Sequence, residues 1–322
     1  MLTFRKEINP SPGGIIYALF AFTLSWVLTP VHSALSYQEL SNFTGGHVEG
    51  TVSITGSFAA PRRFNLVLYA DPYYCGRISD GKGWRFSPIT QTGPNQSLPE
   101  AIVYLEDVER GKPIPSTSQV VQTKNCVFLP YVSSAKAGEP LRFQNWDPVE
   151  HKLEIFLTSN TGGLRLFGQA LLPHPDNRKS DFLAEGTTGQ HRAGVEVTYA
   201  INETGIILFR CNYHEYMEGW SVVLPHPYVT MAGERGEFSI TDIPPGSYNL
   251  VVWHPVGRTS TSIEIHPDQT LTLNLEIPST SATIYPEPPS KIDPFGIELV
   301  GDSHIAPTVE RQKFGAPSKA AR

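Results

Sequence analysis

Alternation of apolar and polar residues is the dominant pattern along this chain. Val48, Val52 and Ile54 are separated by polar residues or glycine, and the same period of two recurs from Leu153 and from Val195. Successive side chains of a strand point to opposite faces of a sheet, so this period predicts half-buried strands. No stretch repeats apolar residues at helical spacing. The pattern therefore predicts an all-β chain of sandwich type.

Shorter apolar runs bounded by Pro, Gly or Asp predict more strands, and the region between Phe156 and Val195 is expected to be a long loop. In one of these strands Ile207, Phe209 and Cys211 share a face. His151 has the parity of the apolar positions in the strand that follows it, so its side chain is expected to point toward the core. The remaining predicted strands cover 64–69, 101–105, 220–224, 237–240, 247–253, 262–265 and 271–275.

Changes in composition divide the chain into units. Proline recurs at Leu224-Pro225-His226-Pro227, and the last 45 residues hold seven prolines without strand periodicity. The predicted units are a leader at 1–33, an N-terminal β region at 34–119, a central β domain at 120–224, a small β module at 225–277 and a disordered tail at 278–322.

The leader has the layout of a cleavable signal peptide. Arg5 and Lys6 precede an apolar run from Ile15 to Leu28, and Val31-His32-Ser33 supplies small residues for cleavage. The run has 14 residues, fewer than the roughly 20 that a membrane-spanning helix needs. We therefore expect a periplasmic or secreted protein in an oxidising compartment. An uncleaved membrane anchor is the alternative.

Composition excludes several classes of function. The 27 glycines, 28 prolines and 11% aromatic residues favour short strands and turns. A net charge of −6 argues against a general nucleic-acid binder or a polybasic membrane binder. The chain contains no Gly-x-Ser-x-Gly motif, phosphate loop, His-Glu-x-x-His motif or dinucleotide fingerprint. We therefore expect no enzyme, although a copper enzyme stays open.

The most specific motif is Cys211, His214 and Met217 in C-x2-H-x2-M spacing at the end of a strand, with His151 earlier in the chain. Two imidazoles, a thiolate and a weak axial thioether form the trigonal site of copper proteins that transfer electrons. A tight loop can place three of these ligands around one ion, while the second histidine arrives from a neighbouring strand. A lapsed site, another metal or plain core packing are the alternatives. Nearby carboxylates could replace the thioether; they are Glu150, Glu215 and Glu218.

This motif resembles that of the cupredoxins of the plastocyanin and azurin type, and its short loop is similar to that of amicyanin. The resemblance extends from Val120 to Leu224. It implies a cupredoxin-like Greek-key β-sandwich at 120–224 that holds one type 1 copper and carries single electrons. His151 would be the early imidazole ligand, Cys211 the thiolate, His214 the late imidazole and Met217 the axial ligand.

The resemblance also implies an electron exit and shows two departures. One is that His151 and Cys211 are 60 residues apart, more than in a minimal cupredoxin. In the family an exposed edge of the late histidine is the exit, so the edge of His214 is expected to reach the surface. The family commonly has asparagine directly after the early histidine, where it braces the ligand loops, whereas this chain has Lys152.

The other two cysteines, Cys75 and Cys126, are 51 residues apart. In an oxidising compartment we expect them to form a disulfide, which would leave Cys211 as the free thiol that a copper ligand must be. The alternative is that one of them belongs to a second metal site.

The last unit contains alternating strands around Pro244-Pro245-Gly246 and resembles the carboxypeptidase regulatory-like fold, a small β-sandwich without catalytic residues. The segment Gly46–Gly56 is similar to the opening strand of that module. The copper-type unit would then be inserted into, or packed on, this sandwich. Together with the copper loop, His226 and His254 resemble residues of methylamine-utilisation-like periplasmic proteins. They could form a second metal site, or be ordinary turn histidines.

Two functions from different classes follow. The first is an exported copper protein that carries electrons to or from a redox partner such as a c-type cytochrome or a dehydrogenase. The acidic chain favours a basic partner, which the dependence of transfer rate on ionic strength would test. The alternative is a cell-envelope β-sandwich module that binds a partner or glycan, in which any copper is structural or stored.

Overall fold

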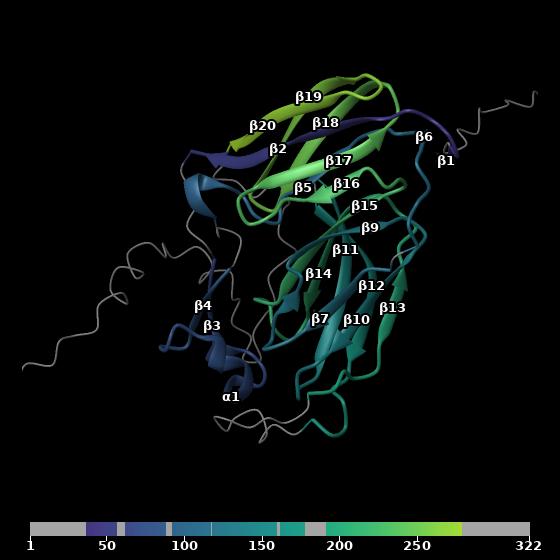
Figure 1. The fold of residues 1–322 in the computed structure, drawn as a ribbon. Helices are drawn as coiled ribbons and strands as arrows, with labels where there is room; N and C mark the ends of the chain where they lie inside the picture. Colours follow the sequence, from purple (N-terminus) through teal and green to yellow (C-terminus); the bar gives the residue numbers. More distant parts are fainter. Residues whose placement is uncertain are drawn as a thin grey trace, which may run out of the picture. The chain divides into compact units, whose positions relative to one another are not determined.

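The computed structural model describes residues 37–56, 62–87, 92–116, 118–159, 162–177 and 191–278. The predicted leader, and the predicted tail after Pro278, lie outside these residues. The described residues form strands and a few very short helices (Figure 1), which confirms the all-β prediction.

The strands are β1 (Gln38–Glu39), β2 (Gly46–Thr55), β3 (Arg63–Asn65), β4 (Trp84–Phe86), β5 (Ile102–Leu105), β6 (Arg110–Gly111), β7 (Val120–Thr123), β8 (Phe128–Leu129), β9 (Val132–Lys136), β10 (Pro140–Asn145), β11 (His151–Ser159), β12 (Gly162–Leu171), β13 (Val197–Ala200), β14 (Gly205–Cys211), β15 (Glu218–Leu224), β16 (Val229–Met231), β17 (Glu237–Ile243), β18 (Gly246–His254), β19 (Gly257–Ile265) and β20 (Thr270–Pro278). The helices are α1 (Pro72–Cys75) and the 3-10 turns η1 (Leu66–Leu68), η2 (Gly76–Ile78) and η4 (Pro94–Gln96).

The central part of the chain folds as a sandwich of two sheets. One sheet has the strand order β13-β10-β7-β8 and the other β12-β11-β14-β15-β9. Apolar side chains of both sheets form one core, in which the rings of Phe128, Phe143 and Phe209 pack edge to face. Leu153 pairs with Cys211 across β11 and β14, so the predicted metal-binding residues lie at one end of this core.

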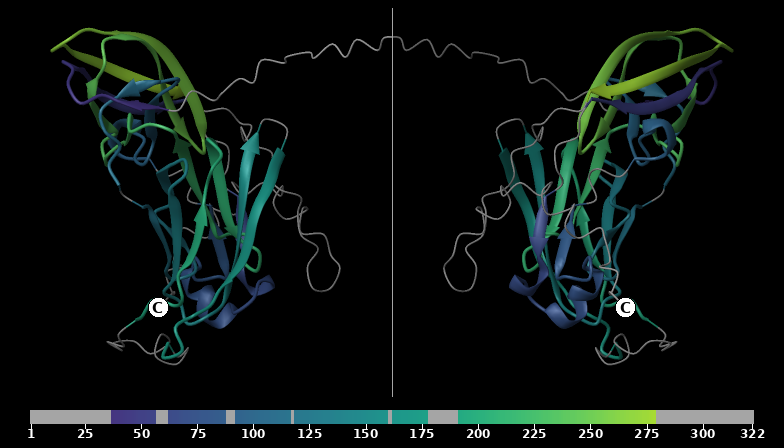
Figure 2. Two further views of the ribbon diagram at one scale, coloured as in Figure 1. Left: turned by 90° about the vertical axis from the view of Figure 1, so that its right-hand side faces the viewer. Right: turned by 90° about the vertical axis from the view of Figure 1, so that its left-hand side faces the viewer.

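A second sandwich combines strands from both ends of the described chain. Its sheets have the orders β16-β5-β18-β19 and β17-β2-β20. The purple strand β2 lies beside the yellow-green β20 in Figures 1 and 2, and Thr51 donates a hydrogen bond to Asn274 across 223 residues. The predicted N-terminal region and the predicted C-terminal module therefore share sheets, with the central sandwich inserted between them in sequence. The unit limits at 119 and 224 themselves stay predictions.

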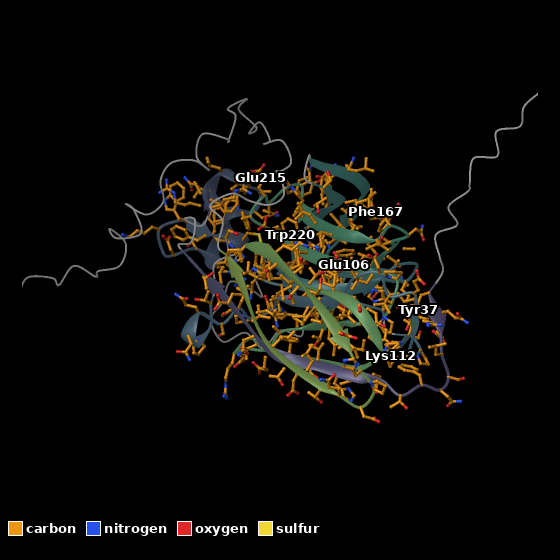
Figure 3. All side chains as sticks on the ribbon, turned by 90° about the horizontal axis from the view of Figure 1, so that it is seen from above. Tyr37, Glu106, Lys112, Phe167, Glu215 and Trp220 are labelled. Carbon is orange, nitrogen blue, oxygen red and sulfur yellow. A yellow bond between two sulfur atoms is a disulfide. The ribbon has the colours of Figure 1, made fainter. Side chains whose placement is uncertain are left out.

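A third apolar cluster contains residues of both sandwiches. Trp253 of β18 packs against Trp220 of β15, with 5.8 Å between ring centroids; Trp220 is labelled in Figure 3. Leu208 of β14 belongs to this cluster, while its neighbour Phe209 belongs to the central core. Strand β14 is therefore buried on both faces, and this explains its nearly continuous apolar sequence.

Two sequence-based expectations are wrong in detail. The predicted strand at 64–69 ends at Asn65, whose side chain accepts a hydrogen bond from the Val67 N–H and starts the turn η1. The predicted loop after Phe156 instead contains the ten-residue strand β12. This strand is at the edge of its sheet and largely exposed, so its glycines and polar residues hide the period of two.

The short helix α1 also had no sequence signal, because four residues are too few for a helical period. Within the described part of the chain, no helix is long and apolar enough to cross a membrane.

Candidate metal centre

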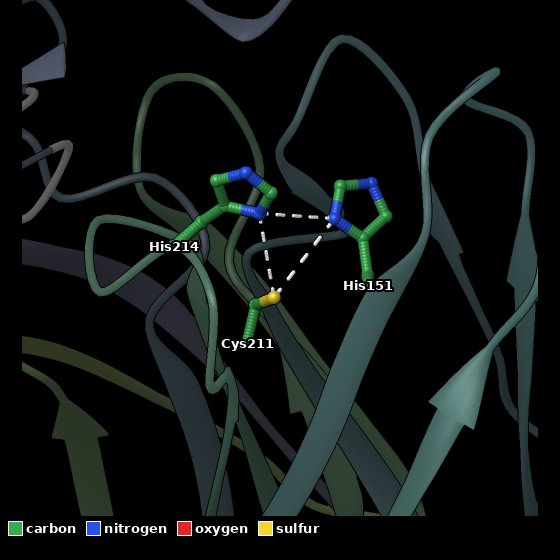
Figure 4. A group of neighbouring side chains, drawn as sticks. All are labelled: His151, Cys211 and His214. Carbon is green, nitrogen blue, oxygen red and sulfur yellow. Dashed lines mark hydrogen bonds between the residues drawn. The ribbon is translucent and has the colours of Figure 1, made fainter. Parts of the chain in front are cut away.

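Three predicted ligands converge at one end of the central core (Figure 4). His151 is the first residue of β11, Cys211 is the last residue of β14, and His214 lies in the loop that follows. The two Nδ1 atoms are 3.2 Å apart, and Cys211 Sγ lies 3.9 Å from Nδ1 of His151 and 3.5 Å from Nδ1 of His214. All three side chains are fully buried. The prediction that the side chain of His151 points into the core is thus confirmed.

The loop from Cys211 to Met217 is closed by its own backbone. The Cys211 N–H donates to the Met217 carbonyl at 3.0 Å, and the Met217 N–H donates to the His214 carbonyl at 2.8 Å. These bonds return the chain directly into β15 and keep His214 over the end of the sheet. Met217 is fully buried in the same core. Its role as axial ligand stays a prediction.

Lys152 braces the loop through its backbone. Its N–H donates to Cys211 Sγ at 3.4 Å, and its carbonyl accepts the Asn212 N–H at 2.6 Å. An N–H donor stabilises a thiolate. The position where the family commonly has asparagine therefore contributes through peptide groups, which do not depend on the side chain.

Both imidazoles are oriented by a partner on their far nitrogen. His151 Nε2 lies 2.9 Å from Asp147 Oδ2, and His214 Nε2 lies 2.9 Å from the Ala70 carbonyl. Because both partners are acceptors, each Nε2 donates a hydrogen bond to its partner, and Nδ1 is the nitrogen of each ring that faces the centre. This arrangement is typical of histidines that bind a metal.

The charges at the site favour a cation. Burial alone would raise the pKa of the Cys211 thiol, but hydrogen bonds and positive charge from His151 and His214 lower it to about 5. Burial would lower the pKa of His151, but Asp147 and Cys211 raise it to about 9. Burial raises the pKa of Asp147, and its hydrogen bonds with His151, Tyr74 and Cys126 outweigh this and lower it. A thiolate and a carboxylate therefore surround the two imidazoles.

The donor set fits one trigonal metal ion. With metal–nitrogen distances of about 2.0 Å and a metal–sulfur distance of about 2.3 Å, the three donor pairs would subtend angles of about 105°, 110° and 130° at the ion. Together they approach the full circle of a planar trigonal site. Two imidazoles and one thiolate in this geometry suit copper.

The flanking carboxylates are engaged elsewhere. Glu215 accepts a hydrogen bond from Tyr69, and Glu150 accepts one from Tyr213. Glu218 accepts from a tyrosine and a serine, Tyr131 and Ser87. Among the described residues, none of the three glutamates belongs to a group of converging metal-ligating atoms.

The expected exposed edge of His214 is wrong. This imidazole is fully buried because the segment around α1 lies against it, with the Ala70 carbonyl on its Nε2. Cys75 Sγ lies 3.7 Å from the same nitrogen. The residues next to His214 in the sequence could not show that a segment more than 130 residues earlier covers this imidazole.

The predicted disulfide between Cys75 and Cys126 is confirmed, and Cys211 is the free cysteine. Asp147 was not among the residues that the sequence pattern indicated for the site, although it is the partner of His151. The sign that could have indicated this partner is an acidic residue in the turn directly before β11, four residues from His151. Cys126 also lies close to Asp147 and His151, but its sulfur is already bonded to Cys75.

The predicted second pair, His226 and His254, lies in the other sandwich. Each is buried, and its Nδ1 accepts the backbone N–H of the residue two positions later. Neither belongs to a group of three or more ligand atoms in the described ranges. The second metal site therefore stays a prediction.

Burial of these two histidines predicts acid sensitivity. It lowers the pKa of His254 from 6.5 to about 3 and that of His226 to about 4. Below pH 6.5 the unfolded chain binds protons that the folded chain does not, so stability falls as pH falls, by about 1.4 kcal/mol per pH unit and histidine. Urea unfolding at pH 6 and pH 5 should show this loss of unfolding free energy. In H254Q the loss between the two pH values should be smaller by the contribution of one histidine. H266Q, at a 58% exposed side chain, should keep the wild-type slope; an unchanged slope in H254Q would contradict the explanation.

Comparison with known proteins gives only distant structural likeness. No protein-family model matches the sequence, and no curated protein is significantly similar to it. A purple cupredoxin from Nitrosopumilus maritimus is similar over 33% of this chain and 99% of its own, with 16% identity and a TM-score of 0.24. Amicyanin from Paracoccus versutus is similar over 34% of this chain and 84% of its own, with 20% identity and a TM-score of 0.23. Such low scores do not assign the chain to a family, so the inference about the site rests on its side-chain geometry.

Proposed function

We propose that this protein is an exported copper protein that carries single electrons between redox partners. One type 1 copper would be held by His151, Cys211 and His214, with Met217 as a weak axial ligand. The observation that carries the proposal is the convergence of both Nδ1 atoms and the Cys211 sulfur in a buried trigonal group. The Cys75–Cys126 disulfide supports an oxidising compartment.

The protein's own groups suit electron transfer. Copper supplies a one-electron couple when bound. Asp147 and the Ala70 carbonyl hold the imidazoles, and the Lys152 N–H holds the sulfur, each at a fixed distance. Donors held by the protein need little rearrangement when the charge of the site changes. Burial excludes water, which would otherwise compete as a ligand.

The proposal is tested by the visible absorption and electron paramagnetic resonance spectra of the purified protein after addition of Cu(II). We expect an intense thiolate-to-copper band with narrow hyperfine splitting, because Cys211 is a thiolate in a trigonal group. C211S should abolish the band while remaining folded. H174Q, at a histidine that pairs with Asp176 and is not one of the three converging residues, should keep it. A colourless protein, or an ordinary tetragonal copper spectrum, would contradict the proposal.

A further inference from the structure

Residues 66–78, here named the cover segment, belong to neither sandwich sheet. They contain η1, α1 and η2, but Leu66, Tyr74 and Cys75 are buried in the same core as Cys211 and Met217. The segment is poorly able to hold its own shape. Helix α1 has four residues, and Asp71 before it has a φ of 52°. Its conformation therefore depends on what it contacts.

The cover segment closes off His214. Its Ala70 carbonyl accepts from His214 Nε2, and Cys75 Sγ lies 3.7 Å from the same atom. Tyr69 packs edge to face on Tyr216, whose ring is 5.5 Å from that of His214. These contacts bury the imidazole and fix which nitrogen faces Cys211.

The same segment reaches His151 through Asp147. The Tyr74 hydroxyl donates to Asp147 Oδ1 at 2.8 Å, and the Cys126 N–H donates to Oδ2 at 3.0 Å. That second oxygen also accepts from His151 Nε2. Each cysteine of the disulfide is thus connected with one imidazole. Cys75 lies beside His214, and the Cys126 N–H binds the carboxylate that orients His151.

We propose that the Cys75–Cys126 disulfide is a positioning element of the metal centre. It clamps the cover segment to the loop after β7, so that the Ala70 carbonyl and the Asp147 carboxylate hold both Nδ1 atoms toward Cys211. It also keeps Cys211 out of contact with solutes. The positioning role rests on the proposed function, because it takes the three side chains as ligands. The shielding of Cys211 does not, because it is a property of the metal-free protein.

The first experiment measures alkylation of Cys211 by iodoacetamide in metal-free protein, followed by mass spectrometry. Cys211 is the free thiol of the wild type and the single cysteine of the variant C75A/C126A. Releasing the clamp lowers the cost of local opening, so we expect alkylation at least about tenfold faster in the variant. Y73A is the control, because that side chain belongs to the same segment and is 88% exposed. It should react within about twofold of wild type. Equal rates in wild type and a folded double variant would overturn the proposal.

The second experiment reads the position of the ligands. In Cu(II)-loaded C75A/C126A we expect a changed thiolate-to-copper band and loss of copper to a chelator about 10- to 100-fold faster, the usual effect of losing an outer hydrogen-bond partner. A band and a loss rate equal to those of the wild type would overturn the positioning role.

If circular dichroism shows that the double variant is unfolded, the alkylation rate of Cys211 is measured in Y74F instead. It keeps the disulfide but removes the hydrogen bond to Asp147. Faster alkylation of Cys211 in Y74F supports the role of the cover segment, and an unchanged rate overturns it. If wild-type protein gives no copper band, the proposed function fails, but the alkylation result still decides the shielding.

Discussion

Replacement of Asp147 by alanine is expected to destabilise the metal-free protein by about 3 kcal/mol or more. The carboxylate is fully buried and accepts three hydrogen bonds, from Tyr74, Cys126 and His151. Removing it leaves three donors without an acceptor in the core, and each buried unpaired donor costs about 1–3 kcal/mol. His151, whose pKa is raised by this neighbour, would also lose its counter-charge.

The same variant should bind metal about 10- to 100-fold more weakly, because His151 loses the partner that holds its Nδ1 toward the centre. Urea unfolding of the metal-free protein measures the first effect, and competitive Cu(II) titration measures the second. D176A is the control: this carboxylate is 66% exposed and pairs with Arg192 at the surface, so its loss should change stability by about 0.5 kcal/mol at most. Wild-type copper affinity in a folded D147A protein would show that Asp147 does not orient the ligand.

Replacement of Phe209 by alanine is expected to cost about 3–5 kcal/mol of unfolding free energy. Its ring is fully buried, with centroids 5.3 Å from Phe128 and 5.4 Å from Phe143. The ring also fills the space beside Gly219, where an added Cβ would overlap Phe209 Cε2. A well-filled space of this kind leaves a cavity when the ring is removed, because the surrounding strands relax only in part.

Urea unfolding of F209A, compared with L164A, measures this effect. Leu164 lies on the edge strand β12 and is 66% exposed, so its truncation should change stability by about 0.5 kcal/mol at most. A loss below about 1 kcal/mol in F209A would show that the core around β14 is not packed as described.

Strand periodicity predicted much of the fold but not the connections between strands. The alternation at Val48, Val52 and Ile54 correctly predicted β2, because burial on one face selects apolar residues at every second position. It could not show that β2 pairs with both β17 and β20. Strand pairing depends on residues more than 180 positions apart, and each partner shows only its own period. Edge strand β12 was missed because it has no consistently buried face.

The sequence by itself determined which residues are candidate metal ligands and the direction of the side chains on their strands. Cys211 follows the face of Ile207 and Phe209, His151 begins β11, and a three-residue step brings His214 back over them. These are local relations, set by the period of a strand and the length of one loop. Only the tertiary structure decided that Asp147 and Ala70 orient the imidazoles and that a disulfide-linked segment buries His214. Those contacts need a turn geometry and a partner up to 144 residues away, and no pattern of neighbouring residues encodes which distant segment fills a given face.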